Sequence, residues 1–205
     1  MDLKTQFNEG LQKCPILAIL RGIGVDEVKA VCDVLYNNGI ALLEVPMNTP
    51  NALECIQIAS EHCRGRQLVG AGTVLEAEQV IAVKKAGGEF IVSPNTDESV
   101  IRQTKTEGML SIPGFFTATE GFQALRFGAD YLKLFPAILG PAYIKDLKAV
   151  IKAPIMAVGG VNTDNLPELL KVCCGAGIGS ALYRPGKTID EIDASVKALL
   201  KVIGR

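Results

Sequence analysis

Histidine is nearly absent from this chain of 205 residues, in which His62 is the only one. It stands at the polar end of a segment with helical periodicity, where we expect an exposed side chain. With one histidine we expect neither a Ser-His-Asp triad nor a histidine-rich metal cage. The sequence therefore predicts no metal ion and no other cofactor.

An excess of charge of either sign is also lacking. Lys and Arg total 21 against 22 Asp and Glu, which gives a formal net charge of −1, and there is no basic block. This balance argues against nucleic acid or an anionic membrane as a partner. No uninterrupted apolar run is long enough to span a membrane, and residues 1–14 are charged and amphipathic, unlike a signal peptide.

The cysteines lack C-x-x-C spacing. The six are Cys14, Cys32, Cys55, Cys63, Cys173 and Cys174. Scattered cysteines in a chain without secretory features are expected to be reduced thiols, which favours a cytoplasmic location.

Apolar residues, in contrast, are plentiful. They make up 48% of the chain against 21% charged residues, enough for a large core, and we expect one domain over residues 1–205. Short apolar runs typical of strands alternate with helical segments, at a spacing of roughly 20 to 25 residues. Strands are expected at 15–20, 41–45, 68–73, 90–93, 109–112, 129–136, 155–158 and 176–178. Helices are expected at 3–13, 25–38, 49–63, 76–86, 97–107, 117–127, 143–150, 165–172 and 189–202.

Repeated strand-then-helix units favour an α/β fold, a (β/α)8 TIM barrel preceded by a short N-terminal helix at 3–13. The competing architecture is a doubly wound sheet, which usually has a glycine fingerprint after the first strand. Here that strand is followed by Arg21-Gly22-Ile23-Gly24, which lacks the third glycine. We therefore rank the barrel first.

Lys133 stands in the middle of the apolar stretch 129–136. Side chains alternate along a strand, so Leu132 and Leu134 point one way and Lys133 points the other. If the leucines pack on helices, Lys133 faces the barrel interior, where burial disfavours its charged form. A desolvated lysine is the nucleophile that amine chemistry on a carbonyl requires. The alternative is a lysine at a strand edge whose ammonium reaches water.

Glu44 satisfies the same alternation. Leu43 and Val45 share one face of their strand and Glu44 lies on the other, so Glu44 and Lys133 can both point into one small barrel. A carboxylate and an amine there offset each other's desolvation and shift each other's pKa. Such a pair can attack a carbonyl and move protons at the adjacent carbon. The alternative is a buried ion pair that only closes the barrel.

Glycines follow the last two expected strands. Gly159-Gly160-Val161 comes after one strand and Gly179-Ser180 after the next. Many barrels bind phosphate at this place through backbone N–H groups. Arg21, at the end of the first strand, is a candidate anchor for a substrate anion.

Taken together, these stretches resemble the family of 2-keto-3-deoxy-6-phosphosugar-acid aldolases, and the similarity extends over nearly the whole chain. It is carried by residues 18–23, the Glu44 stretch, 70–74, Pro94-Asn95, 133–136, 157–161 and 177–180. The resemblance implies a class I aldolase without metal, in which Lys133 forms a Schiff base and Glu44 shuttles protons. The products would be pyruvate and glyceraldehyde 3-phosphate. Members of the family are typically homotrimers, so a homotrimer is expected.

The resemblance also implies which residues surround the phosphorylated keto-acid substrate. The expected substrate-binding residues are Arg21, Asn48, Thr73, Pro94, Phe135, Gly159, Gly160, Val161, Gly179 and Ser180.

The stretch Glu44-Val45-Pro46-Met47-Asn48-Thr49-Pro50 bears on the branch of the family. The branch acting on the gluconate-derived substrate has an arginine where Asn48 stands, assigned to the pyruvyl carboxylate. The galactonate-derived branch carries a Glu-x-Pro-x-Asn-Ser/Thr-Pro pattern, which this chain matches. We therefore expect the galactonate-derived substrate, with the gluconate-derived acid or 4-hydroxy-2-oxoglutarate as the alternative. Arg21 and Thr73 are then the candidates for holding the carboxylate.

Two other functions are compatible with these residues. A phosphosugar isomerase or epimerase would use Glu44 as a proton-abstracting base and would not need the amine of Lys133. A non-catalytic sensor of a phosphorylated ligand would keep the pair only as a structural element. The pairing of the lysine with the glutamate favours the aldolase.

Overall fold

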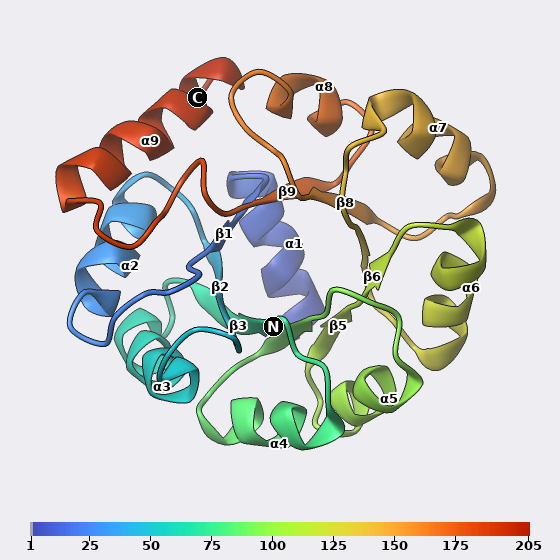
Figure 1. The fold of residues 1–205 in the computed structure, drawn as a ribbon, viewed down its shortest axis with the longest axis horizontal. Helices are drawn as coiled ribbons and strands as arrows, with labels where there is room; N and C mark the ends of the chain where they lie inside the picture. The colour runs from blue at the N-terminus through green and yellow to red at the C-terminus, as the bar shows by residue number, and fades with distance from the viewer. Residues whose placement is uncertain (1) are drawn as a thin grey trace.

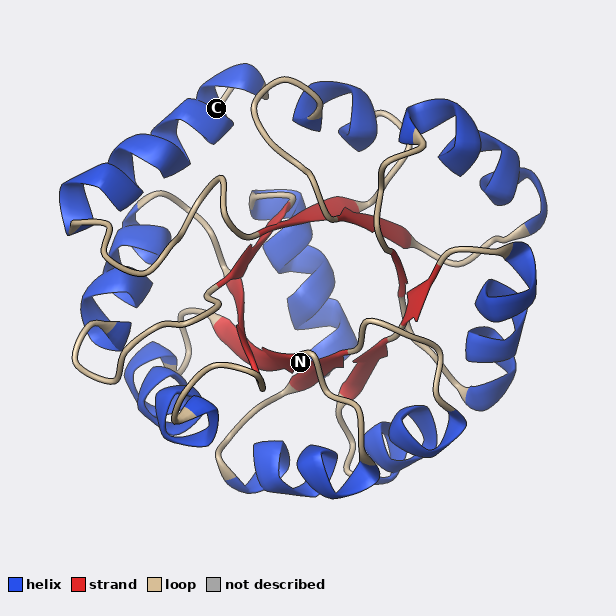
Figure 2. Ribbon diagram, in the orientation of Figure 1, coloured by secondary structure: helices blue, strands red, loops and turns tan. Residues whose placement is uncertain are grey.

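The computed structural model describes residues 2–205, whose strands form a ring with helices around it (Figures 1 and 2). The strands are β1 (Ile16–Ile19), β2 (Leu42–Pro46), β3 (Leu68–Gly72), β4 (Phe90–Val92), β5 (Leu110–Ile112), β6 (Gly114–Phe115), β7 (Leu132–Leu134), β8 (Ile155–Val158) and β9 (Gly175–Ile178). The helices are α1 (Leu3–Lys13), α2 (Val28–Asn37), α3 (Ala52–Cys63), α4 (Ala77–Lys85), α5 (Glu98–Thr106), α6 (Ala118–Phe127), α7 (Gly140–Val150), α8 (Leu166–Leu170) and α9 (Ile189–Val202).

The sheet is parallel throughout, in the order β5-β4-β3-β2-β1-β9-β8-β7-β6. Its two outermost strands, β5 and β6, are consecutive in the chain and separated only by Pro113. Proline has no N–H for a strand ladder, so two short strands stand where the sequence predicted one ending at residue 112. The result is a nearly closed, TIM-like barrel of nine parallel strands among the described residues.

Two apolar layers line the strands, one inside the ring and one beneath the helices. Leu43, Leu132 and Leu134 belong to the layer packed under the helices, whereas Tyr131 belongs to the interior layer. Alternation along β7 therefore places Lys133 on the interior face, as the sequence pattern predicted. Alternation along β2 does the same for Glu44.

Helix α1 lies across one end of the ring, where the strands begin (Figure 2). Its side chain Phe7 is fully buried and packs against Phe90 and Tyr131, with ring centroids 5.3 and 4.8 Å apart. The hydroxyl of Tyr131 donates to Oδ1 of Asn8 at 2.6 Å. Aromatic packing and a satisfied hydroxyl thus close this end of the barrel.

The largest differences from the expected helix boundaries are found in four helices. Helix α3 begins at Ala52 rather than near residue 49. Helix α2 begins at Val28 rather than residue 25. In the turn before it, the N–H of Gly24 donates to Oε1 of Glu27 at 2.9 Å. Helix α7 begins earlier than expected, at Gly140, with Pro141 in its first turn, where a missing N–H costs nothing. Helix α8 spans only Leu166–Leu170. In residues 2–205, no helix combines the length and apolarity needed to cross a membrane.

Replacing Phe7 should measure the contribution of the α1 end to stability. Phe7→Ala would leave a cavity beside two aromatic rings, so we expect the free energy of unfolding to fall by about 3 to 5 kcal/mol in urea denaturation. Phe122→Ala on α6 is the control, because Phe122 is 41% exposed, and a shift of less than about 0.5 kcal/mol is expected there. A loss below about 1 kcal/mol for Phe7→Ala would show that α1 does not support the barrel.

Candidate active site

Lys133 lies in the middle of β7 with its amine inside the barrel. The residue is 6% exposed, and its Nζ lies 4.6 Å from the centroid of the Phe135 ring. Within residues 2–205 it makes no hydrogen bond and no ion pair within 4.0 Å. Burial lowers the pKa of Lys133, the nearby Glu44 carboxyl opposes that change, and the charge of Arg21 adds to it. The amine is thus available in its neutral form at lower pH than an ordinary lysine.

Glu44 lies on β2 across the ring from β7, with β1, β9 and β8 between the two strands. It is 2% exposed, and its Oε2 has no hydrogen-bond partner among residues 2–205. Burial raises the pKa of Glu44 to about 7, against the opposing effects of Lys133 and Arg21. A carboxyl with this pKa can both accept and donate protons near neutral pH.

The space for the Glu44 carboxyl is provided by Gly72 at the end of β3. A Cβ atom at Gly72 would lie 2.3 Å from Oε2 of Glu44, so any side chain there would displace the carboxyl. Gly72 was not among the residues predicted for the site. In the sequence, the one feature that marks it is its place as a glycine at the end of the strand that comes after the Glu44 strand.

Thr73 follows directly and has an unusual backbone. Its φ is +54°, a left-handed conformation that is uncommon for a β-branched residue. Strain of this kind persists where the surrounding structure fixes it, and it gathers at functional sites. Thr73 is half-buried at the barrel mouth, beside the glycine that makes room for Glu44.

The loops after β1 and β2 meet at Arg21. Its Nη1 donates a hydrogen bond to Oδ1 of Asn48. The N–H of Gly22 donates to Oγ1 of the buried Thr49 at 2.9 Å. Arg21 is exposed, yet its charge acts on both Lys133 and Glu44. The structure therefore brings Arg21 and Asn48 together at the edge of the site.

The loop that carries Arg21 is also attached to the loop after β9. Oε1 of Glu27 accepts hydrogen bonds from the N–H of Gly24 at 2.9 Å and from the hydroxyl of Tyr183 at 2.7 Å. Tyr183 is 2% exposed. Tyr183 and Glu27 are 156 positions apart in the sequence, so no local pattern predicts this contact.

The glycine motif after β8 forms a turn against the Phe135 ring. Gly159 and Gly160 have φ values of +93° and +73°, and a Cβ at Gly159 would lie 3.2 Å from the ring. Gly160 is exposed and Val161 is buried. Both glycines border a pocket of about 540 Å³ that extends toward α7 and α8. The backbone of this glycine motif is therefore exposed at Gly160, next to the Phe135 ring, whose centroid lies 4.6 Å from Nζ of Lys133.

The second motif begins a tight turn after β9. The carbonyl of Gly179 accepts hydrogen bonds from the N–H groups of Leu182 and Tyr183 at 2.8 and 2.9 Å. Ser180 is exposed within this turn. Because β8 and β9 are neighbours in the sheet, both motifs follow adjacent strand ends.

Pro94 follows β4 on the other side of the mouth. Its carbonyl carbon and oxygen would lie 2.3 Å from a Cβ at Gly114, so a glycine is needed there. Gly114 in turn pairs in register with Lys133. Pro94 is thereby held near the strand of the lysine.

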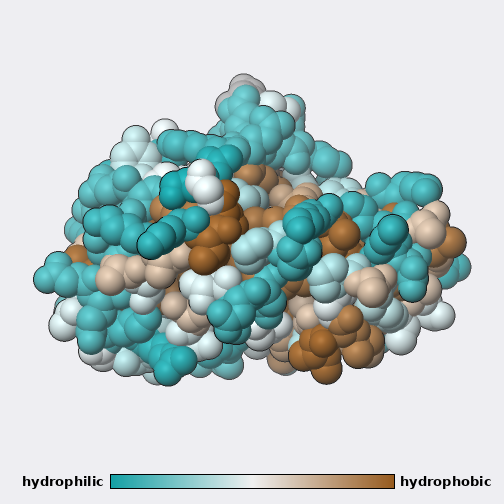
Figure 3. Space-filling model, turned by 90° about the horizontal axis from the view of Figure 1, so that it is seen from above, coloured by the Kyte–Doolittle hydropathy of each residue, from teal (hydrophilic) through white to brown (hydrophobic). Residues whose placement is uncertain are grey.

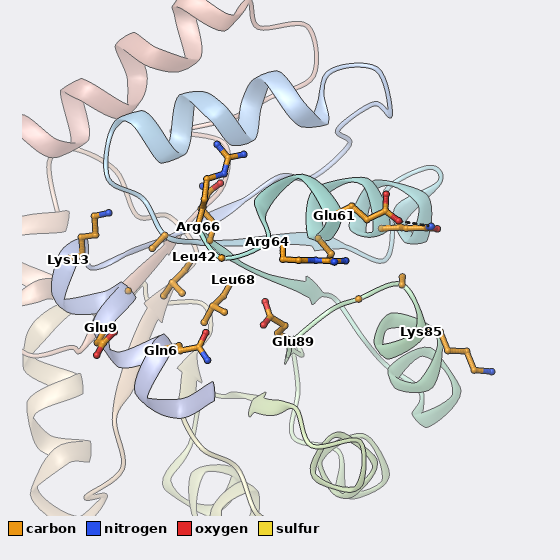
Figure 4. A pocket seen from close by; sticks show the side chains of 18 residues that line it. Gln6, Glu9, Lys13, Leu42, Glu61, Arg64, Arg66, Leu68, Lys85 and Glu89 are labelled. Atoms are coloured by element: carbon orange, nitrogen blue, oxygen red, sulfur yellow. Dashed lines mark hydrogen bonds between the residues drawn. The ribbon is translucent and has the colours of Figure 1, made fainter. Parts of the chain in front are cut away.

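A different pocket, of about 520 Å³, lies at the opposite end of the barrel beside α1 (Figure 4). Charged residues such as Arg64, Lys85 and Glu89 line it, and neither Lys133 nor Glu44 does. In the part of the chain that the structure describes, no three His, Cys, Asp or Glu side chains gather in a group that could hold a metal ion. The interior-facing lysine and glutamate remain the chemically distinctive pair.

The Glu44 carboxyl should titrate near pH 7. Carbon-13 NMR of protein labelled at glutamate Cδ, compared with Glu44→Gln to assign the signal, should give a midpoint of about 7 because burial disfavours the anion. Lys133→Met should move that midpoint higher, since the opposing positive charge is removed. A midpoint near the ordinary glutamate value of about 4.3 would contradict the burial seen here.

Comparison with known proteins places the chain in a family. A family model described as KDPG and KHG aldolase matches residues 7–199. The 2-dehydro-3-deoxy-6-phosphogalactonate aldolase of Escherichia coli (strain K12) is 42% identical over 193 residues, 92% of this chain and 94% of that protein. The KHG/KDPG aldolase of the same organism is 28% identical over 93% of this chain and 90% of that protein.

Solved structures agree with these sequence matches. The structure described as "Native KDPGal structure" has a TM-score of 0.90 at 42% identity, over 93% of this chain and 94% of that chain. The KDPG aldolase of Legionella pneumophila, with pyruvate captured as a covalent carbinolamine, has a TM-score of 0.85 at 25% identity, over 97% and 98%. With the family model matching nearly its whole length, this chain belongs to the KDPG and KHG aldolase family.

Proposed function

We propose that this protein is a class I aldolase that cleaves 2-dehydro-3-deoxy-6-phosphogalactonate reversibly to pyruvate and D-glyceraldehyde 3-phosphate. The observation that carries the proposal is the burial of Lys133 and Glu44 on interior faces of one barrel. The captured carbinolamine in the relative from Legionella pneumophila supports covalent chemistry of this kind.

The reaction begins at the neutral amine of Lys133, which attacks the keto carbon C2 of the substrate. The carbinolamine loses water to give an iminium ion, which accepts the electrons of the C3–C4 bond when that bond breaks. The C4 hydroxyl loses its proton, and the aldehyde leaves. The resulting enamine takes a proton at C3, and hydrolysis releases pyruvate and the free amine. Each proton needs a nearby acid or base, and Glu44 supplies it because its pKa of about 7 keeps both forms populated.

The loops at the mouth bind the rest of the substrate in this proposal. Arg21 and Thr73 hold the keto-acid carboxylate, since the cation of Arg21 already acts on Lys133 and Glu44. Pro94 and Phe135 pack beside the reacting carbons. The phosphate is bound at the opposite side of the mouth by exposed backbone and hydroxyl groups. These belong to Gly159, Gly160, Val161, Gly179 and Ser180.

The choice of the galactonate-derived substrate rests on the relatives. Proteins named for 2-dehydro-3-deoxy-6-phosphogalactonate, from Escherichia coli and Rhizobium meliloti, are 42% and 39% identical to this chain. A protein named for phosphogluconate, from Pseudomonas aeruginosa, is 31% identical. The Glu-x-Pro-x-Asn-Thr-Pro pattern from Glu44 to Pro50 favours the same branch.

We also propose a fold description, a cellular location and an oligomeric state. We count β5 and β6 as one strand interrupted at Pro113, which makes the single domain a (β/α)8 barrel with α1 as an added helix. We place it in the cytoplasm as a homotrimer. Apolar side chains remain on its surface, where a second copy could cover them (Figure 3). The most exposed of the large ones are Leu75, Ile138, Leu139 and Val150.

Borohydride trapping tests the Schiff base directly. Reduction in the presence of pyruvate should add a covalent adduct to Lys133, detected by peptide mass spectrometry. Lys133→Met should lose the adduct and lower kcat by on the order of 10⁴-fold or more, as when a covalent nucleophile is removed. Substantial turnover by Lys133→Met would instead favour an isomerase or epimerase that uses Glu44 alone. Thermal stabilisation by a phosphorylated keto acid without any turnover would favour a sensor.

Substrate preference is tested by comparing kcat/KM for the galactonate-derived and gluconate-derived acids in the same assay. The two acids differ in the configuration of one hydroxyl, and a site that pairs this hydroxyl in only one of them discriminates against the other. We expect the galactonate-derived acid to be cleaved at least about tenfold more efficiently. A preference for the gluconate-derived acid would leave the aldolase chemistry intact and overturn the assignment of substrate.

A further inference from the structure

Arg21 is held in place by a neighbouring loop. Its Nη1 donates to Oδ1 of Asn48, which lies in the loop after β2. One residue further along each loop, the N–H of Gly22 donates to Oγ1 of Thr49 at 2.9 Å, and Thr49 is 5% exposed. The two loops are therefore joined by adjacent contacts, one between side chains and one anchored in a buried hydroxyl.

The contact with Asn48 leaves most of the guanidinium free. Arg21 has five N–H donors in a planar fork, and the bond to Asn48 is the one hydrogen bond that its side chain makes in residues 2–205. The remaining N–H groups can bind a carboxylate with two parallel hydrogen bonds. Leu20, the residue before Arg21, donates its N–H to the carbonyl of Glu44 at 2.9 Å, so Arg21 follows the point where β1 and the Glu44 strand pair. The charge of Arg21 also acts on both Glu44 and Lys133.

We propose that Asn48 is a positioning residue, which fixes the guanidinium of Arg21 for the keto-acid carboxylate and does not itself contact the substrate. This inference rests on the proposed function, in which Arg21 is the anchor of that carboxylate. It deepens the sequence expectation, which placed Asn48 among the substrate-binding residues without assigning it a partner.

The physical reason is the freedom of an exposed arginine. Arg21 is exposed at the mouth, where its long side chain can adopt many rotamers. A hydrogen bond from a charged donor is strong enough to select one of them. Loss of the Asn48 oxygen therefore releases the guanidinium while the side chains of Lys133 and Glu44 stay on their own strands.

A double-mutant cycle between Arg21 and Asn48 tests the inference. The variants are Arg21→Ala, Asn48→Leu, which keeps the size of the side chain but lacks the acceptor, and the combination of both. Two quantities are measured in each: KM and kcat for the galactonate-derived acid, and the pyruvate concentration that half-saturates borohydride trapping on Lys133. Asn37→Leu is the matched control, because Asn37 is exposed and is the last residue of α2, at the end of the helix that leads to the start of β2.

Asn48→Leu should raise KM and the half-saturating pyruvate concentration about tenfold, with kcat changed less than about threefold. Arg21→Ala should raise both at least as much, and the double variant should be no worse than Arg21→Ala. Asn48→Gln keeps an amide acceptor oxygen on a longer side chain and should raise KM less than Asn48→Leu does. Asn37→Leu should change neither quantity. If thermal unfolding shows that Asn48→Leu is not folded, Asn48→Ala takes its place in the cycle.

Losses that multiply in the double variant would mean that Asn48 contacts the substrate directly, which overturns the inference. An unchanged KM in Asn48→Leu overturns it as well. An unchanged KM in Arg21→Ala, with pyruvate still trapped on Lys133, removes Arg21 as the anchor and leaves the aldolase reaction standing. Failure to trap pyruvate on Lys133 in the unmodified protein is the separate result that rejects the proposed function.

Discussion

The desolvation of an amine and a carboxyl inside one barrel is the constraint on which this structure depends. Within the described residues 2–205, neither Lys133 nor Glu44 has an ion-pair partner within 4.0 Å, so each keeps part of the cost of burial. That cost lowers the pKa of the lysine and raises the pKa of the glutamate to about 7. The two changes move both groups toward the range in which an amine attacks carbonyls and a carboxyl exchanges protons.

Burying this pair requires space and closure from the rest of the fold. Gly72 leaves room for the Glu44 carboxyl, and the Phe135 ring lies over the amine of Lys133. At the other end, Phe7 of α1 is fully buried and packs against Phe90 and Tyr131 where the strands begin. Aromatic packing thus closes one end of the barrel, and the proposed chemistry lies at the other end, the usual division in such folds.

The mouth is built from loops that support one another. The Arg21 loop is fastened to the loop after β2 through Thr49 and to the loop after β9 through Tyr183 and Glu27. A relative that shares 42% of its sequence and one that shares 25% have TM-scores of 0.90 and 0.85 with this chain. The barrel therefore tolerates extensive substitution, and differences in substrate choice within the family are expected in these loops.

The sequence by itself determined the alternation of strands and helices, the interior faces of Lys133 and Glu44, and the glycines after β8 and β9. These features depend on local periodicity and on backbone conformations that few residues adopt. Only the tertiary structure decided the division of a strand at Pro113, the space that Gly72 leaves, and the pairing of Arg21 with Asn48. Each of these depends on which distant strands and loops become neighbours when the ring closes, and local sequence patterns do not contain that information.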